Sequence, residues 1–468
     1  MSLADAWNWF GLVFEYSFAF FSIGAAVFLF LAVMKEKRAR LYGWIGGGCA
    51  IWMMLSFILG TTGNAQFGVP ARGFMGTFQF ALSMILIIVG VFLLFFAFDT
   101  KKNVDEKEAF YSTLLLAGFI LGIGIYIFIP SAAIFFGPQD ITTIESLLPY
   151  YTITYPFPMA RVTITVIPLV IFVVGAYVIK EMRAKKYETN AMQEVDKYQK
   201  TVSKLDLEIS RKIYHVLILV IIVMYISVGR TILENIYNFS VYGLPQQPGM
   251  PDPINIWNDI VLPYILDFRA GHLIFLLAVS WIFFILLFTD IVRVKKYRYY
   301  PIKMLAKIYR DKERVVLAPH VYLTGGILFA VILSDGFNGL LGNPGVGLGI
   351  SAQIVMITIM ISALADAIAT IIGVTKGKHH LKGGKGRKTW EGWIAGLVSA
   401  VLLGFLSFLI LMPYCGGTFG EAIVFALVGA GVFALIDFFS PPIPFSDNIL
   451  NPIAISLALW GVWFLFFF

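Results

Sequence analysis

The sequence predicts an all-α polytopic membrane protein with about twelve transmembrane helices. Hydrophobic residues make up 59% of the 468 residues, and charged residues make up only 13%. A water-soluble domain carries about twice that charged fraction, so this chain is too apolar to fold in water. Long apolar runs recur along the whole sequence, and the basic residues gather in alternate connecting loops. Together, these three observations define the predicted fold class.

Each apolar run is close to the length of about 20 residues that crosses a bilayer as a helix. The runs lie at 8–33, 42–60, 76–98, 112–136, 161–180, 213–229, 271–290, 318–335, 348–373, 392–412, 420–440 and 449–468. The first run has no basic n-region and no small-residue cleavage site, which indicates a retained helix rather than a signal peptide.

The basic residues predict the orientation of these helices. Five loops hold 31 of the 35 Lys and Arg residues, and they lie at 34–41, 99–111, 180–212, 291–317 and 374–391. By the positive-inside rule, all five loops are cytoplasmic and both termini are external. The net charge of +7 therefore indicates contact with anionic lipid or a phosphate substrate, not with nucleic acid.

Three regions are predicted. Residues 1–180 form a five-helix membrane region with no assigned chemistry, and residues 181–210 form a cytoplasmic amphipathic linker lying on the membrane. Residues 211–468 form a membrane domain that carries the candidate chemistry. Cys49 and Cys415 lie far apart and lack metal-ligand spacing, so neither a disulfide framework nor a thiolate metal site is indicated.

A first polar cluster lies at the predicted mouth of the sixth span. Glu208, Arg211, Lys212 and His215 are spaced to share one helical face. The basic groups could hold a phosphate. The alternative is that Arg211 and Lys212 are ordinary membrane anchors and that His215 is a packed or interfacial histidine.

A second signal is Asp366, a lone carboxylate inside the apolar span 348–373. Ser362 and Thr370 flank it at four-residue spacing, and small alanines surround it. An ionised carboxylate in hydrocarbon costs several kcal/mol unless it is paired, bound to metal or hydrated, so Asp366 is a functional candidate. The alternative is a neutral aspartic acid that is hydrogen-bonded within a helix interface.

A third signal is the loop that follows, GKHHLKGGKGRKTWEG from Gly377 to Gly392. Its glycines expose backbone amides and its Lys and Arg residues supply charge, a combination that suits a polyphosphate. It is not a Walker A loop, because Arg387 stands before Lys388 where that motif has glycine. The alternative is a solvated basic loop that contacts lipid headgroups.

A fourth signal is the run PPIPFSDNILNPI, where Asp447 and Asn448 begin the last span behind a proline-rich turn. Aspartate at a helix start is most often an N-cap. The predicted topology, however, places Asp447 on the same membrane face as Asp366 and Glu391. Several carboxylates at one place suit Mg²⁺, which prefers oxygen ligands.

Four motifs together resemble the polyprenol kinase family, which includes dolichol kinase and phytol kinase and is related to phosphatidate cytidylyltransferase. The motifs are RKIYH at 211–215, ADAIATIIG at 365–373, GK with GRKTWEG at 377–392, and SDNILNPI at 446–453. The resemblance covers roughly residues 205–468. It implies transfer of the γ-phosphoryl group of CTP to the hydroxyl of a lipid alcohol, dolichol or polyprenol, at the cytoplasmic face.

The resemblance also implies roles for individual residues. It places Mg²⁺ near Asp366, Glu391 and Asp447, which together with Lys388 form the expected catalytic set. The expected CTP-binding residues are Arg211, Lys212, His215, Lys376, Gly377, Lys378, Gly383, Gly384, Lys385, Gly386, Arg387, Lys388, Thr389 and Asn448.

Two departures from the related patterns bear on the reaction. Ser446 stands before Asp447, whereas the family usually has two adjacent acidic residues at this point. The Asp-Arg signature of the cytidylyltransferases does not occur after Pro413, which favours the kinase. Two alternatives stay open: a CTP-dependent cytidylyltransferase acting on a phospholipid precursor, and a transporter of an anionic lipid or phosphorylated solute. The expected location is a prokaryotic plasma membrane, or the endoplasmic reticulum in a eukaryote.

Overall fold

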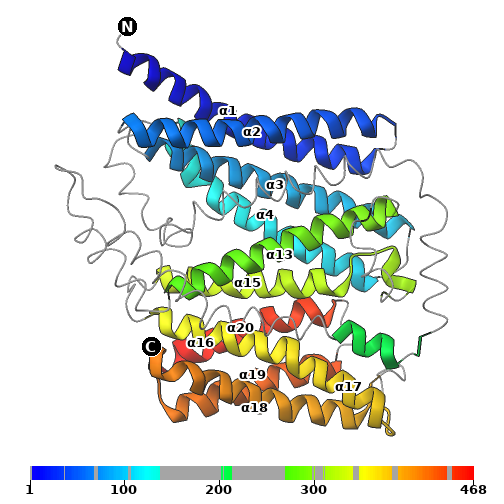
Figure 1. Cartoon of the computed structure of the whole chain (residues 1–468). Coiled ribbons are helices and arrows are strands. Elements are labelled where there is room, and N and C mark those ends of the chain that lie inside the picture. Colours follow the sequence, from blue (N-terminus) through cyan, green and yellow to red (C-terminus); the bar gives the residue numbers. More distant parts are fainter. Residues whose placement is uncertain are drawn as a thin grey trace. The chain divides into compact units, whose positions relative to one another are not determined.

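A computed structural model describes most of the predicted helices. It covers residues 3–35, 37–67, 72–103, 107–136, 202–203, 205–212, 269–297, 300, 309, 311–340, 347–381, 388–439 and 445–467. Every regular element within these ranges is a helix, in agreement with the predicted all-α class (Figure 1).

The chain forms two compact units. The first unit comprises Met1–Thr201 and Trp281–Tyr322, and the second comprises Val202–Ser280 and Leu323–Phe468. The segment Trp281–Tyr322, which the sequence analysis assigned to the domain 211–468, thus belongs to the first unit. Much of the predicted linker 181–210 lies outside the described residues.

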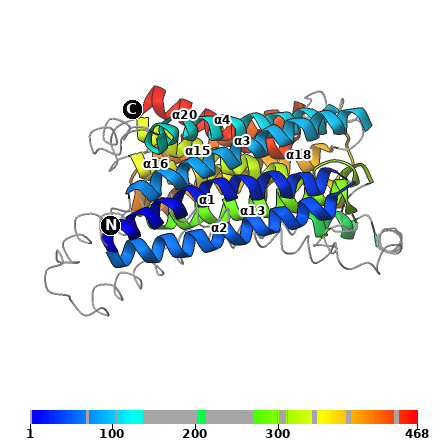
Figure 2. The same ribbon diagram turned by 90° about the horizontal axis from the view of Figure 1, so that it is seen from above.

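In the first unit, long helices pack in antiparallel pairs. They are α1 (Leu3–Met34), α2 (Ala39–Phe67), α3 (Arg72–Asn103) and α4 (Lys107–Phe136). Both views show α1 beside α2 and α3 beside α4 (Figures 1 and 2). The loops between the paired helices are only a few residues long, which makes neighbouring helices antiparallel.

A buried ion pair fixes the end of α13 (Arg269–Lys295) in this unit. Arg293 and Asp290 are each 1% exposed, and Arg293 Nε donates to Asp290 Oδ1 at 2.5 Å. Arg293 also donates to the carbonyl of Val316 at 2.6 Å, and the amide of Ala318 donates to Asp290 at 2.7 Å. These bonds satisfy both charges and join the end of α13 to the residues before α15.

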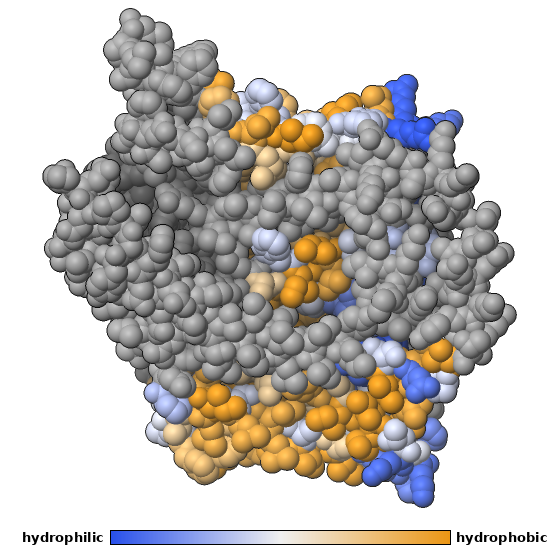
Figure 3. All heavy atoms as spheres, in the orientation of Figure 1, coloured by the Kyte–Doolittle hydropathy of each residue, from blue (hydrophilic) through white to orange (hydrophobic). Residues whose placement is uncertain are grey.

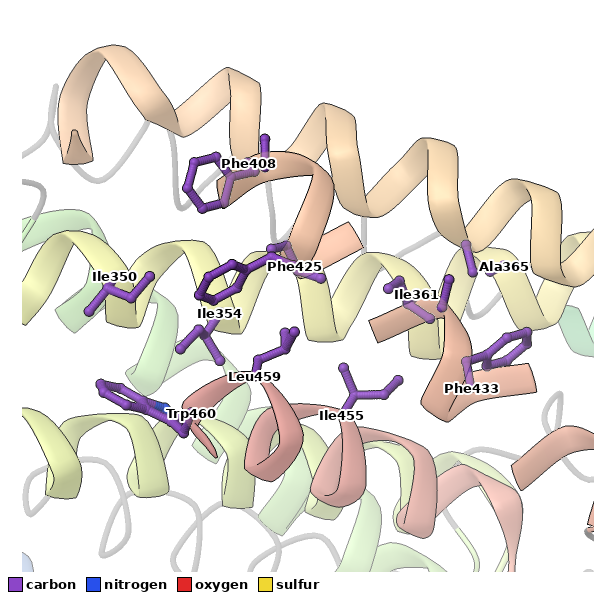
Figure 4. Close-up of a cluster of buried hydrophobic side chains, with 14 residues drawn as sticks. Ile350, Ile354, Ile361, Ala365, Phe408, Phe425, Phe433, Ile455, Leu459 and Trp460 are labelled. Atoms are coloured by element: carbon purple, nitrogen blue, oxygen red, sulfur yellow. The ribbon is translucent and has the colours of Figure 1, made fainter. Parts of the chain in front are cut away.

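The second unit holds the remaining helices. They are α15 (Pro319–Leu340), which enters this unit at Leu323, α16 (Gly347–Ile359), the π-helix η5 (Met360–Ala365), α17 (Asp366–Lys376), α18 (Trp390–Cys415), α19 (Phe419–Phe439) and α20 (Asp447–Phe466). Large apolar side chains from several of these helices meet in one core, including Ile361, Phe408, Phe425, Ile455 and Trp460 (Figure 4).

Among the residues that the structure describes, seven helical segments are long and apolar enough to cross a membrane. They are Tyr16–Met34, Phe80–Lys101, Lys107–Ile129, Ile350–Lys376, Trp390–Pro413, Phe419–Phe439 and Asp447–Phe466. On α18, apolar side chains at four-residue spacing stay about half exposed, from Ile394 through Leu402 to Ile410. Apolar surface is visible in this part of the second unit (Figure 3). Such a face suits lipid, and the chain is a multi-pass integral membrane protein.

Ten of the twelve predicted spans coincide with described helices. The other two, at 161–180 and 213–229, lie outside the described residues. The total of about twelve spans and the external placement of both termini therefore stay predictions.

Candidate functional site

Three carboxylates meet at one end of the second unit. Asp366 begins α17, Asp437 lies near the end of α19, and Asp447 begins α20. One carboxylate oxygen from each lies within 4.8 Å of the other two. The sequence analysis selected Asp366 and Asp447 and did not select Asp437.

The π-helix η5 immediately precedes Asp366. A π-helix is wider than an α-helix and changes the direction of the side chains that follow, and such turns occur frequently at functional sites. Ala363 and Ala365 within η5 are fully buried, so neighbouring helices approach closely here. The sequence signal of small residues around Asp366 thus corresponds to a closely packed junction between α16 and α17.

Two lysines neutralise most of the charge of these carboxylates. Lys212, from the helical segment 205–212, donates to Asp366 Oδ2. Lys388 Nζ donates to Asp437 Oδ1 at 2.5 Å and to the carbonyl of Asp437 at 2.8 Å, and it lies 3.7 Å from Asp447 Oδ2. Burial lowers the pKa of Lys388, but the carboxylates of Asp447 and Asp437 outweigh this effect and hold its pKa above the usual range. Lys388 is therefore charged at neutral pH.

A short backbone ladder positions Lys388 just before α18. The amide of Leu381 donates to the carbonyl of Lys388 at 3.0 Å, and the amide of Trp390 donates to the carbonyl of His379 at 2.9 Å. Thr389 then caps α18 by accepting from the amide of Gly392 at 3.3 Å. Hydroxyl residues are favoured at this capping position, so the sequence KT fixes both the lysine and the start of the helix.

Two glycines allow α17, the loop and α18 to touch. A Cβ at Gly392 would lie 2.7 Å from the carbonyl oxygen of Ala369 and 2.9 Å from the Cα of Gly373. A Cβ at Gly377 would lie 2.5 Å from Thr389 Oγ1. Side chains do not tolerate such contacts, so glycine at these positions allows α17 to pack directly against Thr389 and the first turn of α18.

Glu391, a predicted metal ligand, has other partners. Its Oε1 lies 2.6 Å from His379 Nδ1, and both of its carboxylate oxygens lie 3.3 Å from the amide of His379. Among the described residues, the group of carboxylates that could share a metal ion contains Asp437 in addition to Asp366 and Asp447, but not Glu391. Glu391 instead holds the start of the loop against the first turn of α18.

The remaining predicted nucleotide-binding residues fall into three groups. Arg211 pairs with Glu208 at 3.1 Å, and Asn448 donates to Asp447 Oδ1 at 3.1 Å. Lys376 and Lys378 are exposed on either side of Gly377. The others lie outside the described residues: His215, Gly383, Gly384, Lys385, Gly386 and Arg387.

A signal for Asp437 exists in the sequence. It is a lone carboxylate near the end of an apolar run, as Asp366 is, and it stands ten residues before Asp447. The intramembrane-carboxylate criterion that selected Asp366 also selects Asp437.

The donor set of this site fits a divalent cation such as Mg²⁺. Carboxylate oxygens are the ligands that this ion prefers, and Asp366, Asp437 and Asp447 would hold it. Because Lys212 and Lys388 occupy the same carboxylates, a bound cation has to replace part of their contacts. The released ammonium groups are then available to an anionic substrate at the same place.

No family model, curated protein or solved structure matches this chain.

Proposed function

We propose that the protein is a CTP-dependent kinase that phosphorylates the hydroxyl of a long-chain isoprenoid lipid alcohol, dolichol or polyprenol, at the cytoplasmic membrane face. The observation that carries this proposal is the convergence of three carboxylates and two lysines, Lys212 and Lys388, at the end of apolar helices. The four-motif resemblance to the polyprenol kinase family supplies the substrate class.

Phosphoryl transfer depends mainly on positioning and on neutralising phosphate charge, which is the chemistry these residues offer. The lipid hydroxyl oxygen forms a bond to the γ-phosphorus, the bond from that phosphorus to the β,γ-bridging oxygen breaks, and CDP leaves. The hydroxyl proton passes to the carboxylate of Asp366 or Asp447. Lys388 and Lys212 bind phosphate oxygens, and Mg²⁺ adds charge neutralisation when it is bound to the aspartates.

The site's position at the end of membrane helices supports a lipid acceptor. Asp366 and Asp437 each lie within or at the end of a candidate span, and exposed apolar side chains cover the outer face of α18. At this depth, the hydroxyl of a lipid alcohol could reach the site from the bilayer, and a water-soluble nucleotide could reach it from the aqueous side.

The direct test is transfer of label. The purified full-length protein in lipid nanodiscs is incubated with Mg²⁺, γ-labelled CTP or ATP, and a panel of dolichol, polyprenol, phytol and diacylglycerol. We expect label from CTP on dolichol or polyprenol, with Asp366→Asn abolishing transfer. Absence of labelled lipid from every alcohol, with Asp366→Asn indistinguishable from wild type, would overturn the proposal.

The same assay separates the two alternatives. A cytidylyltransferase releases pyrophosphate and places α-label from CTP on a phospholipid precursor. A transporter turns over no nucleotide, and Lys388→Ala then changes only solute or lipid uptake.

A further inference from the structure

Two buried polar side chains lie in the second unit next to the three aspartates. Ser362 in η5 and Asn451 in α20 are each 2% exposed. Neither Ser362 Oγ nor Asn451 Oδ1 has a hydrogen-bond partner within the described part of the chain. A buried polar atom without a partner costs about 1–3 kcal/mol, so a ligand or a water molecule that bonds to these two atoms would be stabilised.

Both side chains are one helical turn from an aspartate of the site. Asn451 follows Asp447 by four residues on α20, so the two share a helix face. Ser362 precedes Asp366 by four residues across the end of the π-helix η5. On α20, the apolar core begins one further turn away, where Ile455 follows Asn451 at the same spacing. On the other helix, the buried Thr358 precedes Ser362 at this spacing, and its hydroxyl also has no partner among the described residues.

Contacts at α19 bring the helix segments η5 and α20 together. A Cβ at Gly429 would lie 2.9 Å from Ile361 Cδ1 and 3.7 Å from Ile455 Cγ2, so η5 and α20 meet against the same turn of α19. Phe433 and Asp437 follow Gly429 at four-residue spacing. Figure 4 shows Ile361, Phe433 and Ile455 directed into one interhelical space. Ser362 and Asn451 thus lie on two helix segments that meet against α19, each four residues from an aspartate.

The chemistry of the pair fits a neutral hydroxyl group. Asn451 Oδ1 is an acceptor and Ser362 Oγ–H is a donor, while an alcohol offers one donor and acceptor lone pairs. Neither side chain carries charge, so the pair suits an alcohol better than a phosphate or a metal ion. The apolar side chains of Ile361, Phe433 and Ile455 suit the hydrocarbon next to such a hydroxyl.

We propose that Ser362 and Asn451 bind the hydroxyl of the lipid alcohol on the membrane side of the three aspartates, and so select an alcohol over other lipid head groups. This inference rests on the proposed kinase function for the identity of the ligand. It assigns the acceptor position to two residues for which the sequence analysis expected no chemical role.

The test measures binding separately from turnover. Equilibrium binding of radiolabelled polyprenol and of the matching polyprenyl acetate, which lacks the hydroxyl, is measured with full-length protein in nanodiscs without nucleotide. We expect wild type to prefer the alcohol about tenfold, which corresponds to about 1.4 kcal/mol. Ser362→Ala combined with Asn451→Leu should remove this preference while acetate binding is unchanged. In turnover, the same double variant should raise KM for polyprenol and leave KM for CTP unchanged.

Ser456→Ala is the matched control. Ser456 is buried on the same helix as Asn451, but its hydroxyl donates to the carbonyl of Ile453 at 2.9 Å. We expect Ser456→Ala to keep the wild-type preference for the alcohol.

Each outcome assigns a failure to one of the two proposals. If label reaches the lipid but the double variant keeps the preference and the KM of wild type, the inference is wrong and the kinase function stands. If wild type prefers the alcohol and the double variant does not, but no label is transferred, the binding position stands and the kinase function is wrong. If the double variant changes only the thermal unfolding temperature, the two side chains have a structural role and the inference is overturned.

Discussion

At the residue scale, Lys388 has two possible partners. In the structure it contacts the carboxylates of Asp437 and Asp447. The same ammonium group could bind a phosphate oxygen once a divalent cation takes over those carboxylates. Binding of a cation to the carboxylates frees the ammonium group for an anion, and binding of an anion to the ammonium group frees the carboxylates for a cation. The two binding events therefore favour each other.

This coupling predicts opposite effects of Lys388→Met on two ligands. Removing the ammonium leaves its carboxylates without a competitor, so Mn²⁺ affinity measured by electron paramagnetic resonance without nucleotide should rise about tenfold, a change of about 1.4 kcal/mol. CTP affinity measured by equilibrium dialysis should fall by a similar factor, because a phosphate partner is lost. Lys378→Met, which removes an exposed lysine of the same loop, should leave Mn²⁺ affinity unchanged. A lower Mn²⁺ affinity in Lys388→Met would contradict the competition.

Asp437 and Glu391 give a second comparison. Because Asp437 belongs to the group of three carboxylates and Glu391 contacts His379 instead, Asp437→Asn should lower Mn²⁺ affinity at least about tenfold. Glu391→Gln should leave it within about twofold of wild type. If Glu391→Gln lowered Mn²⁺ affinity and Asp437→Asn did not, Glu391 would be a metal ligand, as the sequence predicted. Asp437 would then not be one.

Much of this site could be predicted from the sequence. Asp366, Asp447, Lys388 and Lys212 were selected from charge placement and motif resemblance, and the structure brings all four together. Asp437 was not selected because it stands at the end of an apolar run without a polar motif around it. Which carboxylates share one space depends on the rotation and depth of three separate helices, and sequence spacing gives these only within a single helix.

At the element scale, the apolar runs predicted where helices lie but not their internal geometry. The span predicted at 348–373 is a continuous helical segment, yet it contains the π-helix Met360–Ala365. A π-turn does not alter the hydrophobic run on which the prediction rested, so the sequence pattern could not reveal it. The close contact between α17 and α18 is a further element-scale feature, and it depends on glycine.

Gly392→Ala should weaken this contact. The added methyl group would lie 2.7 Å from the carbonyl oxygen of Ala369, and overpacking of this kind costs about 1–3 kcal/mol. We expect a lower unfolding temperature in detergent, followed by intrinsic tryptophan fluorescence. Gly461→Ala on α20 is the control, because a Cβ there meets nothing within 4 Å, and alanine is the better helix former. An unfolding temperature for Gly392→Ala equal to that of the control would show that α17 and α18 do not need this contact.

At the scale of the whole molecule, the helix ends of the second unit define two opposite sides. Lys388 joins the start of α18 to Asp437 near the end of α19 and to Asp447 at the start of α20. The turn between α18 and α19 lies at the other end of these helices, near Gly416 and Gly420. The positive-inside rule, applied to the basic loop 374–391, predicts that the aspartate side is cytoplasmic. A kinase that draws on cellular CTP requires this orientation.

Cysteine labelling in intact cells tests that orientation. Lys378→Cys places a thiol in the exposed loop on the aspartate side, and Gly420→Cys places one at an exposed position on the other side, where a Cβ meets only Thr418 Oγ1 at 3.9 Å. Both substitutions are made with Cys49→Ser and Cys415→Ser, so that no native thiol reacts. A membrane-impermeant maleimide should label Gly420→Cys from outside and Lys378→Cys only in inverted vesicles. Labelling of Lys378→Cys from outside would place the three aspartates on the external face, where they could not meet intracellular CTP, and would contradict both the predicted topology and the kinase.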